Sequence, residues 1–375
     1  MVKKAAARIL LVVISLICTL ALCEVFLRIN ADERQRYYVW EPNLHHTFLP
    51  DSTVLYGISG QGRFTINAYG VRGGWNNDCS QRYVALGGST TECLYLDDTE
   101  TWQHHLSRLT GYCIAGMGKS GCGLFENYLH LKYAVPNLPR VDGIILMAGL
   151  NDMFRYLALA DSFRYAAGWS PMYEDSMVRS IFITSDYYYQ NKPLYRLQVV
   201  RLLVNVLKRN RPVPWESVQD VHGHQYNTWR SKRRNAAICD SLPDLRPGLK
   251  YFRDCLDSFY ALCTQRKYRL VLVSQAYIYK DTMPDYENTM LWMGGKGDFL
   301  NRQASAYYTT RALKEAAIAY NNALKIFCMQ HRDVVWVDLD GALPKDTSVF
   351  YDDCHFNEMG AERAAHVMAE KLRNL

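Results

Sequence analysis

A single serine follows two glycines at the end of an apolar run in "YVALGGSTTE", residues 83–92. Residues 84–86 favour a short buried strand, the glycines allow a tight turn, and residues 90–92 can open a helix. This pattern places the Ser89 hydroxyl at a strand-to-helix corner, where it could act as a nucleophile. A serine at a helix start is also a common N-cap, whose hydroxyl only accepts a backbone amide. The stretch alone predicts where the hydroxyl lies and leaves its role open.

An aspartate and a histidine stand three residues apart near the other end of the chain, in "SVFYDDCHFNEMG". A carboxylate at the spacing of Asp352 and His355 can reach the imidazole Nδ1, fix the tautomer and leave Nε2 as a general base. A lone histidine is more often a structural residue. Together with Ser89, the pair supplies all three residue types of a Ser-His-Asp triad.

Two further stretches carry groups that could stabilise an anion. The glycines of "AGMGKSGCG", residues 115–123, let the backbone approach a ligand and point amides outward. They match neither GxxxxGK[ST] nor GxGxxG in full, which disfavours a nucleotide site. In "MAGLNDM", residues 147–153, the Asn151 amide could donate to a developing oxyanion, although Asn-Asp pairs are also good turn formers.

Strands and helices alternate along most of the chain beyond residue 82. Because apolar strands with helical connections form parallel sheets covered on both faces, we expect an α/β fold. Sites in such folds lie beyond the carboxyl ends of the strands, where Ser89, Asn151 and the Asp-His pair all fall. Residues 31–81 predict short strands, with "GRFTINAYGVRGG" as one arm of a hairpin. Strands are expected at 83–86, 112–115, 143–148, 270–273 and 334–337, and helices at about 99–109, 123–134, 247–265, 303–330 and 358–374.

The N-terminus predicts a membrane segment. Basic residues at positions 3, 4 and 8 precede an apolar run, and residues 5–27 suffice to cross ~30 Å of hydrocarbon. We interpret residues 1–30 as a signal anchor that leaves the remaining chain outside the cytoplasm, periplasmic or extracellular. The alternatives are a cleaved signal peptide, which would give a secreted protein, and a buried soluble helix, which the basic cluster disfavours.

Composition narrows the classes of protein further. The 375 residues are 49% hydrophobic and 21% charged, which is ordinary for a globular protein, and a net charge of +6 does not indicate nucleic-acid binding. Of eleven cysteines, nine lie outside the apolar N-terminus, so at least one cannot pair within the chain. No zinc spacing appears, and the pairs at 45–46 and 222/224 favour surface histidines over metal ligands. We therefore expect no metal and no cofactor.

A long insertion at about 153–245 interrupts the alternation, and a shorter loop covers 274–300. Tyr187–Tyr189 could form a platform for a sugar ring or acyl chain, and Leu194–Leu207 resembles an apolar helix. The segment is therefore either a lid or scaffold. Its basic clusters suggest a solvated face, lipid headgroups or an anionic glycan; they are Lys208, Arg209 and Arg211, and Arg230, Lys232, Arg233 and Arg234.

These blocks resemble the SGNH hydrolases, the GDSL-like lipase/esterase family, in its membrane-anchored bacterial type. The resemblance covers about Arg82–Phe154 and Val334–Leu375, together with the "FTINAYGVRG" arm. It implies Ser89 as nucleophile, Asp352 and His355 as its triad partners, and an oxyanion hole from the Ser89 and Gly121 amides and the Asn151 side chain. It also implies a three-layer α/β/α, flavodoxin-like fold with a five-stranded parallel sheet in 82–375. Departures from the family pattern are Gly88 for Asp, Gly116 for a frequent Asn, and Cys354 within the Asp-His pair; none removes a reacting group.

The function that the resemblance implies is a serine esterase acting on an acyl, foremost an acetyl, ester of a carbohydrate or lipid outside the cytoplasm. An O-acyltransferase acting on an envelope polysaccharide would use the same site. A third possibility is a non-catalytic binding protein tethered to the membrane. The acyl group, the acceptor, the disulfide pairing and the oligomeric state are left open.

Overall fold

Five parallel strands form the central sheet of the computed structural model, which describes residues 2–30, 36–75, 78–160, 163, 171–184, 194, 197–200, 202, 203, 220–297 and 304–373. Their order is β12-β9-β6-β4-β5, which in chain order is the 2-1-3-4-5 arrangement of flavodoxin-like folds. The expected fold class is confirmed, and each expected strand is found to within two residues. The strands are β4 (Arg82–Gly87), β5 (Cys113–Gly116), β6 (Gly143–Met147), β9 (Arg269–Val273) and β12 (Val335–Val337).

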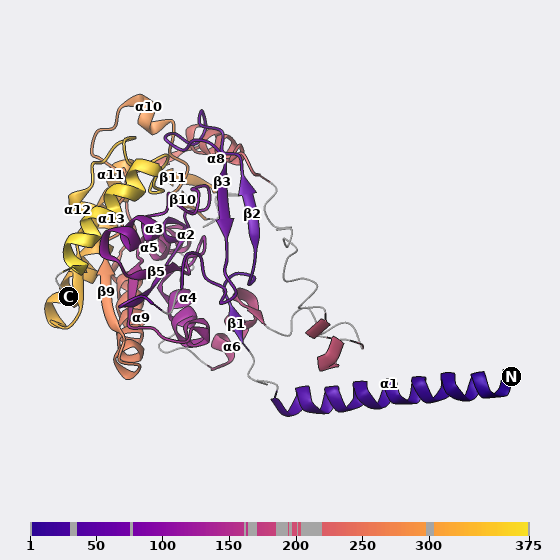
Figure 1. Ribbon diagram of the computed structural model, residues 1–375. Helices are drawn as coiled ribbons and strands as arrows, with labels where there is room; N and C mark the ends of the chain where they lie inside the picture. The colour runs from indigo at the N-terminus through magenta and orange to yellow at the C-terminus, as the bar shows by residue number, and fades with distance from the viewer. Residues whose placement is uncertain are drawn as a thin grey trace.

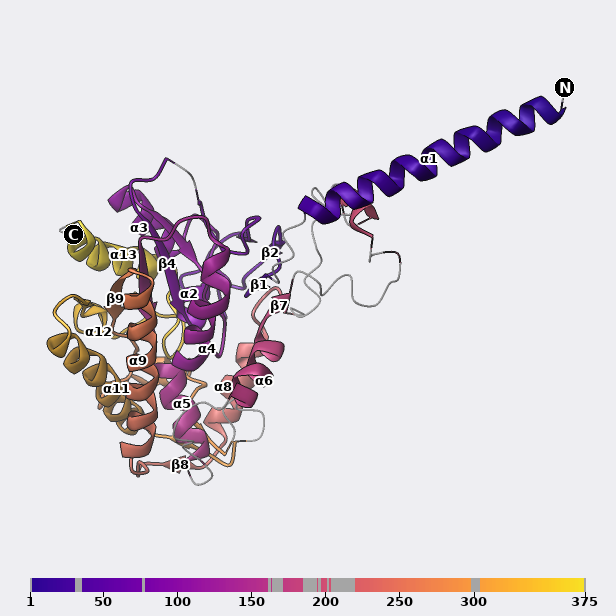
Figure 2. The same ribbon diagram turned by 90° about the horizontal axis from the view of Figure 1, so that it is seen from below.

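Helices cover both faces of this sheet, as the fully buried strands β4, β5 and β6 require. Figure 2 shows α3 (Trp102–Thr110) and α13 (Glu358–Leu372) together on one face. The other face carries α4 (Leu124–Leu129), α5 (Leu150–Leu159), α9 (Arg246–Gln265) and α11 (Thr310–Gln330). Shorter pieces are α2 (Ser89–Glu92), α6 (Pro171–Ile181), α8 (Gln225–Arg234), α10 (Asp285–Asn288), α12 (Leu339–Ala342), the π-helical turn η1 (His130–Ala134) and the 3-10 turn η2 (Val135–Asn137).

One expected helix begins later than its apolar pattern suggested. The prediction of a helix from 303 is wrong for its first residues, because Ala306–Tyr308 form strand β11. This strand pairs with β10 (Gly295–Lys296) and with β8 (Ile238–Cys239) in a small separate sheet. Helix α11 starts only after Thr309, whose side chain accepts the Ala312 amide as an N-cap.

The N-terminal arm forms the expected hairpin and shares the core of the sheet domain. Strands β2 (His45–Phe48) and β3 (Gly62–Thr65) pair antiparallel (Figure 1), and β1 (Tyr37–Tyr38) pairs with β7 (Ile183–Thr184). A bridge between Arg72 and Gly116 continues the arm to the edge of the central sheet. Buried arm residues such as Phe48 and Phe64 belong to the same hydrophobic cluster as Val84 of β4. The arm is therefore a packed part of the domain.

Helix α1 (Val2–Asn30) stands apart from the sheet domain in both ribbon views (Figures 1 and 2), and its Glu24 accepts the Val199 amide at 3.0 Å. Its segment Arg8–Ile29 is long and apolar enough to cross a membrane, and none of it is buried by the protein. An apolar helix that buries nothing needs apolar surroundings, as a signal sequence or a membrane anchor has.

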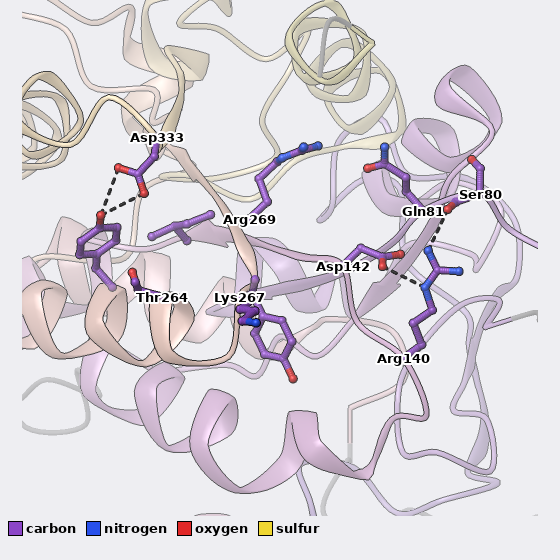
Figure 3. A pocket seen from close by; sticks show the side chains of 11 residues that line it. Ser80, Gln81, Arg140, Asp142, Thr264, Lys267, Arg269 and Asp333 are labelled. Carbon is purple, nitrogen blue, oxygen red and sulfur yellow. Dashed lines mark hydrogen bonds and ion pairs between the residues drawn. The ribbon is translucent and has the colours of Figure 1, made fainter.

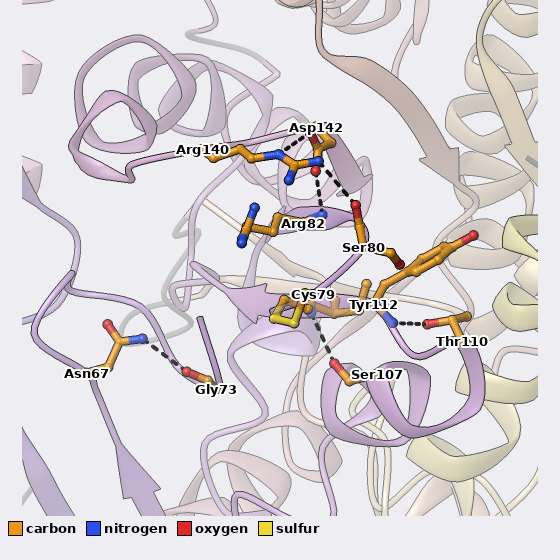
Figure 4. The surroundings of a disulfide bond; sticks show 12 residues. Asn67, Gly73, Cys79, Ser80, Arg82, Ser107, Thr110, Tyr112, Arg140 and Asp142 are labelled. Carbon is orange, nitrogen blue, oxygen red and sulfur yellow. Dashed lines mark hydrogen bonds and ion pairs between the residues drawn. A yellow bond between two sulfur atoms is a disulfide. The ribbon is translucent and has the colours of Figure 1, made fainter. Parts of the chain in front are cut away.

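A disulfide joins Cys79, just ahead of β4, to Cys113 at the start of β5 (Figure 4). The remaining cysteines among the described residues are thiols, so the expectation of at least one unpaired cysteine is confirmed. Disulfides persist in oxidising compartments, and the bond together with α1 suggests a domain outside the cytoplasm.

Candidate active site

Three side chains that are distant in sequence form one hydrogen-bonded chain at the carboxyl edge of the sheet. Ser89 Oγ lies 2.7 Å from His355 Nε2, and His355 Nδ1 lies 2.7 Å from Asp352 Oδ2. Ser89 is the first residue of α2, directly behind β4, so the predicted corner is correct. The N-cap residue is Gly88, and the Ser89 hydroxyl faces the imidazole. The alternative reading of Ser89 as a cap is therefore wrong.

The two glycines ahead of Ser89 are packed so closely that neither position could hold a side chain. A Cβ on Gly87 would lie 2.2 Å from Thr91 Oγ1, and one on Gly88 would lie 2.2 Å from Asn151 Nδ2. The position where the resembled family carries Asp is thus closed by Asn151 in this chain. A carboxylate at residue 88 would displace the Asn151 amide from the neighbourhood of the nucleophile.

Asp352 is fully buried and carries four hydrogen bonds. Its Oδ1 accepts the backbone amides of Cys354 (3.0 Å) and His355 (2.9 Å). Its Oδ2 accepts His355 Nδ1 and the Trp292 indole N–H, the latter at 2.8 Å. Burial alone would raise the pKa of this carboxyl, but His355 and these donors outweigh burial and hold its pKa below the usual value.

The pKa of His355 is shifted in the opposite direction, upward. Burial lowers its pKa, but the Asp352 carboxylate outweighs burial, and the pKa is raised above the ordinary value of 6.5. With Nδ1–H donating to Asp352, the neutral imidazole presents Nε2 as an acceptor for the Ser89 hydroxyl. The arrangement can therefore draw a proton from Ser89.

Two backbone amides of the predicted oxyanion hole form no hydrogen bond within the described protein. Among the described residues, no protein acceptor takes the N–H of Ser89 or of Gly121. Gly121 has a φ of 78°, in the left-handed region that favours glycine, and its carbonyl accepts Arg155 Nη2 at 3.0 Å. This bond fixes the peptide at one end of the glycine-rich loop.

Asn151 lies in the first turn of α5, so the alternative of a loop turn is wrong. Its Nδ2 donates to the Cys122 carbonyl at 2.8 Å, and a side-chain amide has a second N–H to give. A Cβ on Gly88 would lie 3.2 Å from that same carbonyl oxygen, which places Asn151 and the glycine-rich loop next to Ser89.

The glycines of residues 115–123 serve close packing within the protein. A Cβ on Gly118 would lie 2.5 Å from the Glu92 amide, so only glycine lets the loop lie against α2. Lys119, which might have faced a phosphate, donates to the Val39 carbonyl at 3.2 Å and lies over the Trp40 ring. These contacts account for the motif without a nucleotide.

Two buried charged residues near the site were not predicted from the sequence, Arg72 of the arm and Glu92 of α2. Arg72, which is buried, donates to the carbonyls of Glu92 (2.8 Å) and Leu96 (2.6 Å), behind the nucleophile. Glu92 is buried and accepts the Ser120 hydroxyl, next to Gly121; burial raises its pKa.

The inserted segment departs from its expected role where the structure describes it. Arg230 and Arg233 are buried, so the reading of this basic cluster as a solvated or ligand-facing surface is wrong for both. His222 and His224 bond the arm, at the Leu49 carbonyl and the Asp51 carboxylate. The proposed Tyr187–Tyr189 platform, half of Leu194–Leu207 and the cluster at 208–211 lie outside the described residues.

Two hollows differ in size and place. A small one of about 10 Å³ adjoins Ser89 and His355, and the other residues that line it are Thr90, Cys93, Tyr95, Leu96, Tyr351 and Phe356. A larger one of about 600 Å³ lies at the opposite edge, by the amino ends of β4, β6 and β9 (Figure 3). There Arg140 pairs with Asp142, and the Tyr260 hydroxyl donates to Asp333. The small hollow is the one within reach of the nucleophile.

No protein-family model and no curated protein matches the sequence. The chain is similar in structure to a member of the lipolytic G-D-S-L family from Veillonella parvula (12% identity, TM-score 0.42, covering 79% of this chain and 100% of that one). It is similar to an acetylxylan esterase from Geobacillus stearothermophilus (11%, 0.41, 78% and 94%) and to a GDSL-like lipase from Bacteroides thetaiotaomicron (11%, 0.37, 78% and 86%). Identity this low does not extend from fold to substrate, so the chemistry proposed below depends on the geometry of this site.

Replacing Asp352 by Asn should lower the pKa of His355, although Asp353 and Glu92 still act to raise it. The substitution removes the carboxylate that raises this pKa and leaves the burial that lowers it. A histidine NMR titration of the full chain in detergent micelles would measure the change, with the His355 signal assigned by its loss in His355→Gln. An unchanged pKa would show that Asp352 does not govern the imidazole.

Proposed function

We propose that this protein is a membrane-anchored serine esterase that removes a short acyl group, foremost acetyl, from a carbohydrate or lipid outside the cytoplasm. The observation that carries the proposal is the unbroken chain of hydrogen bonds from Ser89 through His355 to Asp352. Proton transfer along such a chain turns a serine hydroxyl into a nucleophile. The amides of Ser89 and Gly121, which form no hydrogen bond within the described protein, support the same chemistry.

In the proposed reaction, Ser89 Oγ bonds to the ester carbonyl carbon while its proton moves to His355 Nε2. The carbonyl oxygen becomes an oxyanion, which the amides of Ser89 and Gly121 and the Asn151 side chain would stabilise. The ester C–O bond then breaks, and His355 returns the proton to the departing alcohol. Water repeats the sequence on the acyl-enzyme, giving the carboxylic acid and free Ser89.

The size of the hollow beside Ser89 supports a short acyl group. About 10 Å³ holds roughly one water-sized group, which matches the methyl of an acetyl ester. The walls are large apolar or aromatic side chains, and Tyr95 and Leu96 are almost fully buried. A longer chain would have to displace them.

Replacing Ser89 by Ala should lower the turnover of p-nitrophenyl acetate by ~1000-fold or more, because the nucleophile is lost. The melting temperature should stay near the wild-type value, since only one hydroxyl is removed. Ser258→Ala on α9 is the matched control, because its hydroxyl bonds only the Asp254 carbonyl, away from the site.

Asn151→Ala should lower turnover by ~100-fold in the same assay, as expected for one oxyanion donor.

Turnover by Ser89→Ala close to that of the wild type would exclude the proposed nucleophile. A wild-type protein that is folded but inactive on every acyl ester tried would favour the non-catalytic binding protein instead.

The wild type should hydrolyse acetyl esters at least ~10-fold faster than butyryl esters, the discrimination that a tight apolar pocket can give per methylene. Leu96→Ala should narrow this ratio by enlarging the hollow. Specificity constants for a p-nitrophenyl acyl series measure the effect, with thermal unfolding as a check that the variant folds. A butyryl preference in the wild type would contradict the pocket assignment.

The proposed anchor predicts that the full chain stays with the membrane after high-salt and alkaline washes. A protease added from outside the cytoplasm should reach the catalytic domain, because the basic residues at the start of α1 remain inside. A soluble product that starts after the apolar segment would instead identify a cleaved signal, and a protected domain would reverse the orientation.

A further inference from the structure

Asp352 has a hydrogen-bond partner that is not part of the triad. The Trp292 indole N–H donates at 2.8 Å to Asp352 Oδ2, the same oxygen that faces His355 Nδ1. We propose that Trp292 is a positioning residue for the reaction, and that α8 of the inserted segment holds it against Asp352. This inference rests on the proposed function and gives α8 a role within it.

The indole N–H acts on the carboxylate in two ways. It fixes the rotation of the carboxylate, because both oxygens of Asp352 are then tied to donors from different segments. It also draws charge from the oxygen that attracts His355, and thereby limits how far Asp352, together with Asp353 and Glu92, raises the pKa of His355. Both effects bear on Nε2, the atom that must accept the Ser89 proton.

Trp292 is itself held on two sides. Its backbone amide donates at 2.8 Å to Oδ2 of Asp353, the residue next to the triad aspartate. Its ring stacks on Trp229 of α8, with centroids 4.5 Å apart and planes at 30°. The Tyr226 ring, also on α8, makes a T-shaped contact with the Trp292 ring, with centroids 5.7 Å apart. The indole therefore has little freedom to turn away from Asp352.

Two arginines of α8 fix the backbone on either side of Trp292. Arg230 Nε donates to the Met290 carbonyl at 3.0 Å, and Arg233 Nη1 donates to the Met293 carbonyl at 2.6 Å. Arg230 also donates through Nη2 to the carbonyl of Tyr351, directly before Asp352, at 2.8 Å. One helix thus contacts both the donor loop and the acceptor loop of the Trp292–Asp352 bond.

The burial of these arginines makes the arrangement stiff. Arg230 and Arg233 are 5% and 6% exposed, and in the part of the chain that the structure describes neither has a carboxylate within ion-pair distance. Backbone carbonyls and aromatic faces contact both guanidinium groups, and the charge of Arg233 also acts on the buried Asp353 carboxyl. Because a buried charge that loses its partners is costly, neither loop can move away without a large penalty.

The test is Trp292→Phe, which keeps an aromatic ring on Trp229 and removes only the N–H. The freed carboxylate oxygen should attract the imidazolium more strongly, so the pKa of His355 should rise. Since His355 must be neutral to accept the proton, the acidic limb of kcat/KM should move to higher pH, by about half a pH unit or more. We expect kcat to fall by about 10-fold, the worth of one hydrogen bond to a charged group, with KM nearly unchanged.

Trp336→Phe on β12 is the matched control, because it makes the same change in the same sheet domain without touching Asp352. It should leave the acidic limb in place. Trp229→Leu removes the stacked face alone and should move the limb in the same direction by a smaller amount. If Trp292→Phe loses activity only in proportion to its folded fraction, with the limb unmoved, Trp292 is structural and the proposal fails.

The NMR titration of His355 separates this inference from the proposed function. A higher His355 pKa in Trp292→Phe than in the wild type supports the positioning role even if no ester is turned over. An unchanged His355 pKa overturns the positioning role even if the wild type is an active esterase.

Discussion

The buried charge of Asp352 is the constraint on which the rest of the site depends. A carboxylate with no exposed surface is tolerated only when hydrogen bonds and a cationic partner replace its water. Here two amides of its own loop, the His355 imidazole and the Trp292 indole do so. These hydrogen bonds fix the turn from Tyr351 to His355, in which the Tyr351 amide donates to the His355 carbonyl at 3.1 Å. The imidazole can then meet Ser89 in only one orientation.

Two buried arginines connect the site to the arm and to the inserted segment, which lie outside the α/β layers. Arg72 of the arm holds the residues that follow the nucleophile helix, and Arg230 of α8 holds the residue before Asp352. Arg230 also donates to the Val54 carbonyl of the arm at 2.7 Å. The arm, the inserted segment and the sheet domain therefore meet at the site and share one core. A domain trimmed to the alternating strands and helices would lack the groups that hold its own triad.

The surroundings of Ser89 also limit what can react there. Tyr95, which walls the small hollow, is tied through its hydroxyl to the Asp220 carbonyl at 3.1 Å and accepts from Gln225 Nε2 at 3.3 Å. The inserted segment thus sets the acyl side of the site as well as the orientation of Asp352. On the other side of the site, Gly87 and Gly88 limit the space, since any side chain there would collide with Thr91 or Asn151. Close packing, more than any flexible lid among the described residues, defines the space in which an ester could lie.

The sequence by itself determined what depends on neighbours along the chain. Apolar runs of strand length, helical periodicity, the glycine corner at Ser89 and the spacing of Asp352 and His355 are local patterns, and the structure has each of them. The tertiary structure decided what depends on residues that are distant in sequence. Trp292 meets Asp352 across 60 residues, Arg230 meets Tyr351 across 121, and Cys79 pairs with Cys113 among many possible partners. The run "RSKRRN" illustrates the reason: a charge cluster predicts a solvated face, because sequence shows the cost of burying arginine and not the carbonyls that the fold brings to it.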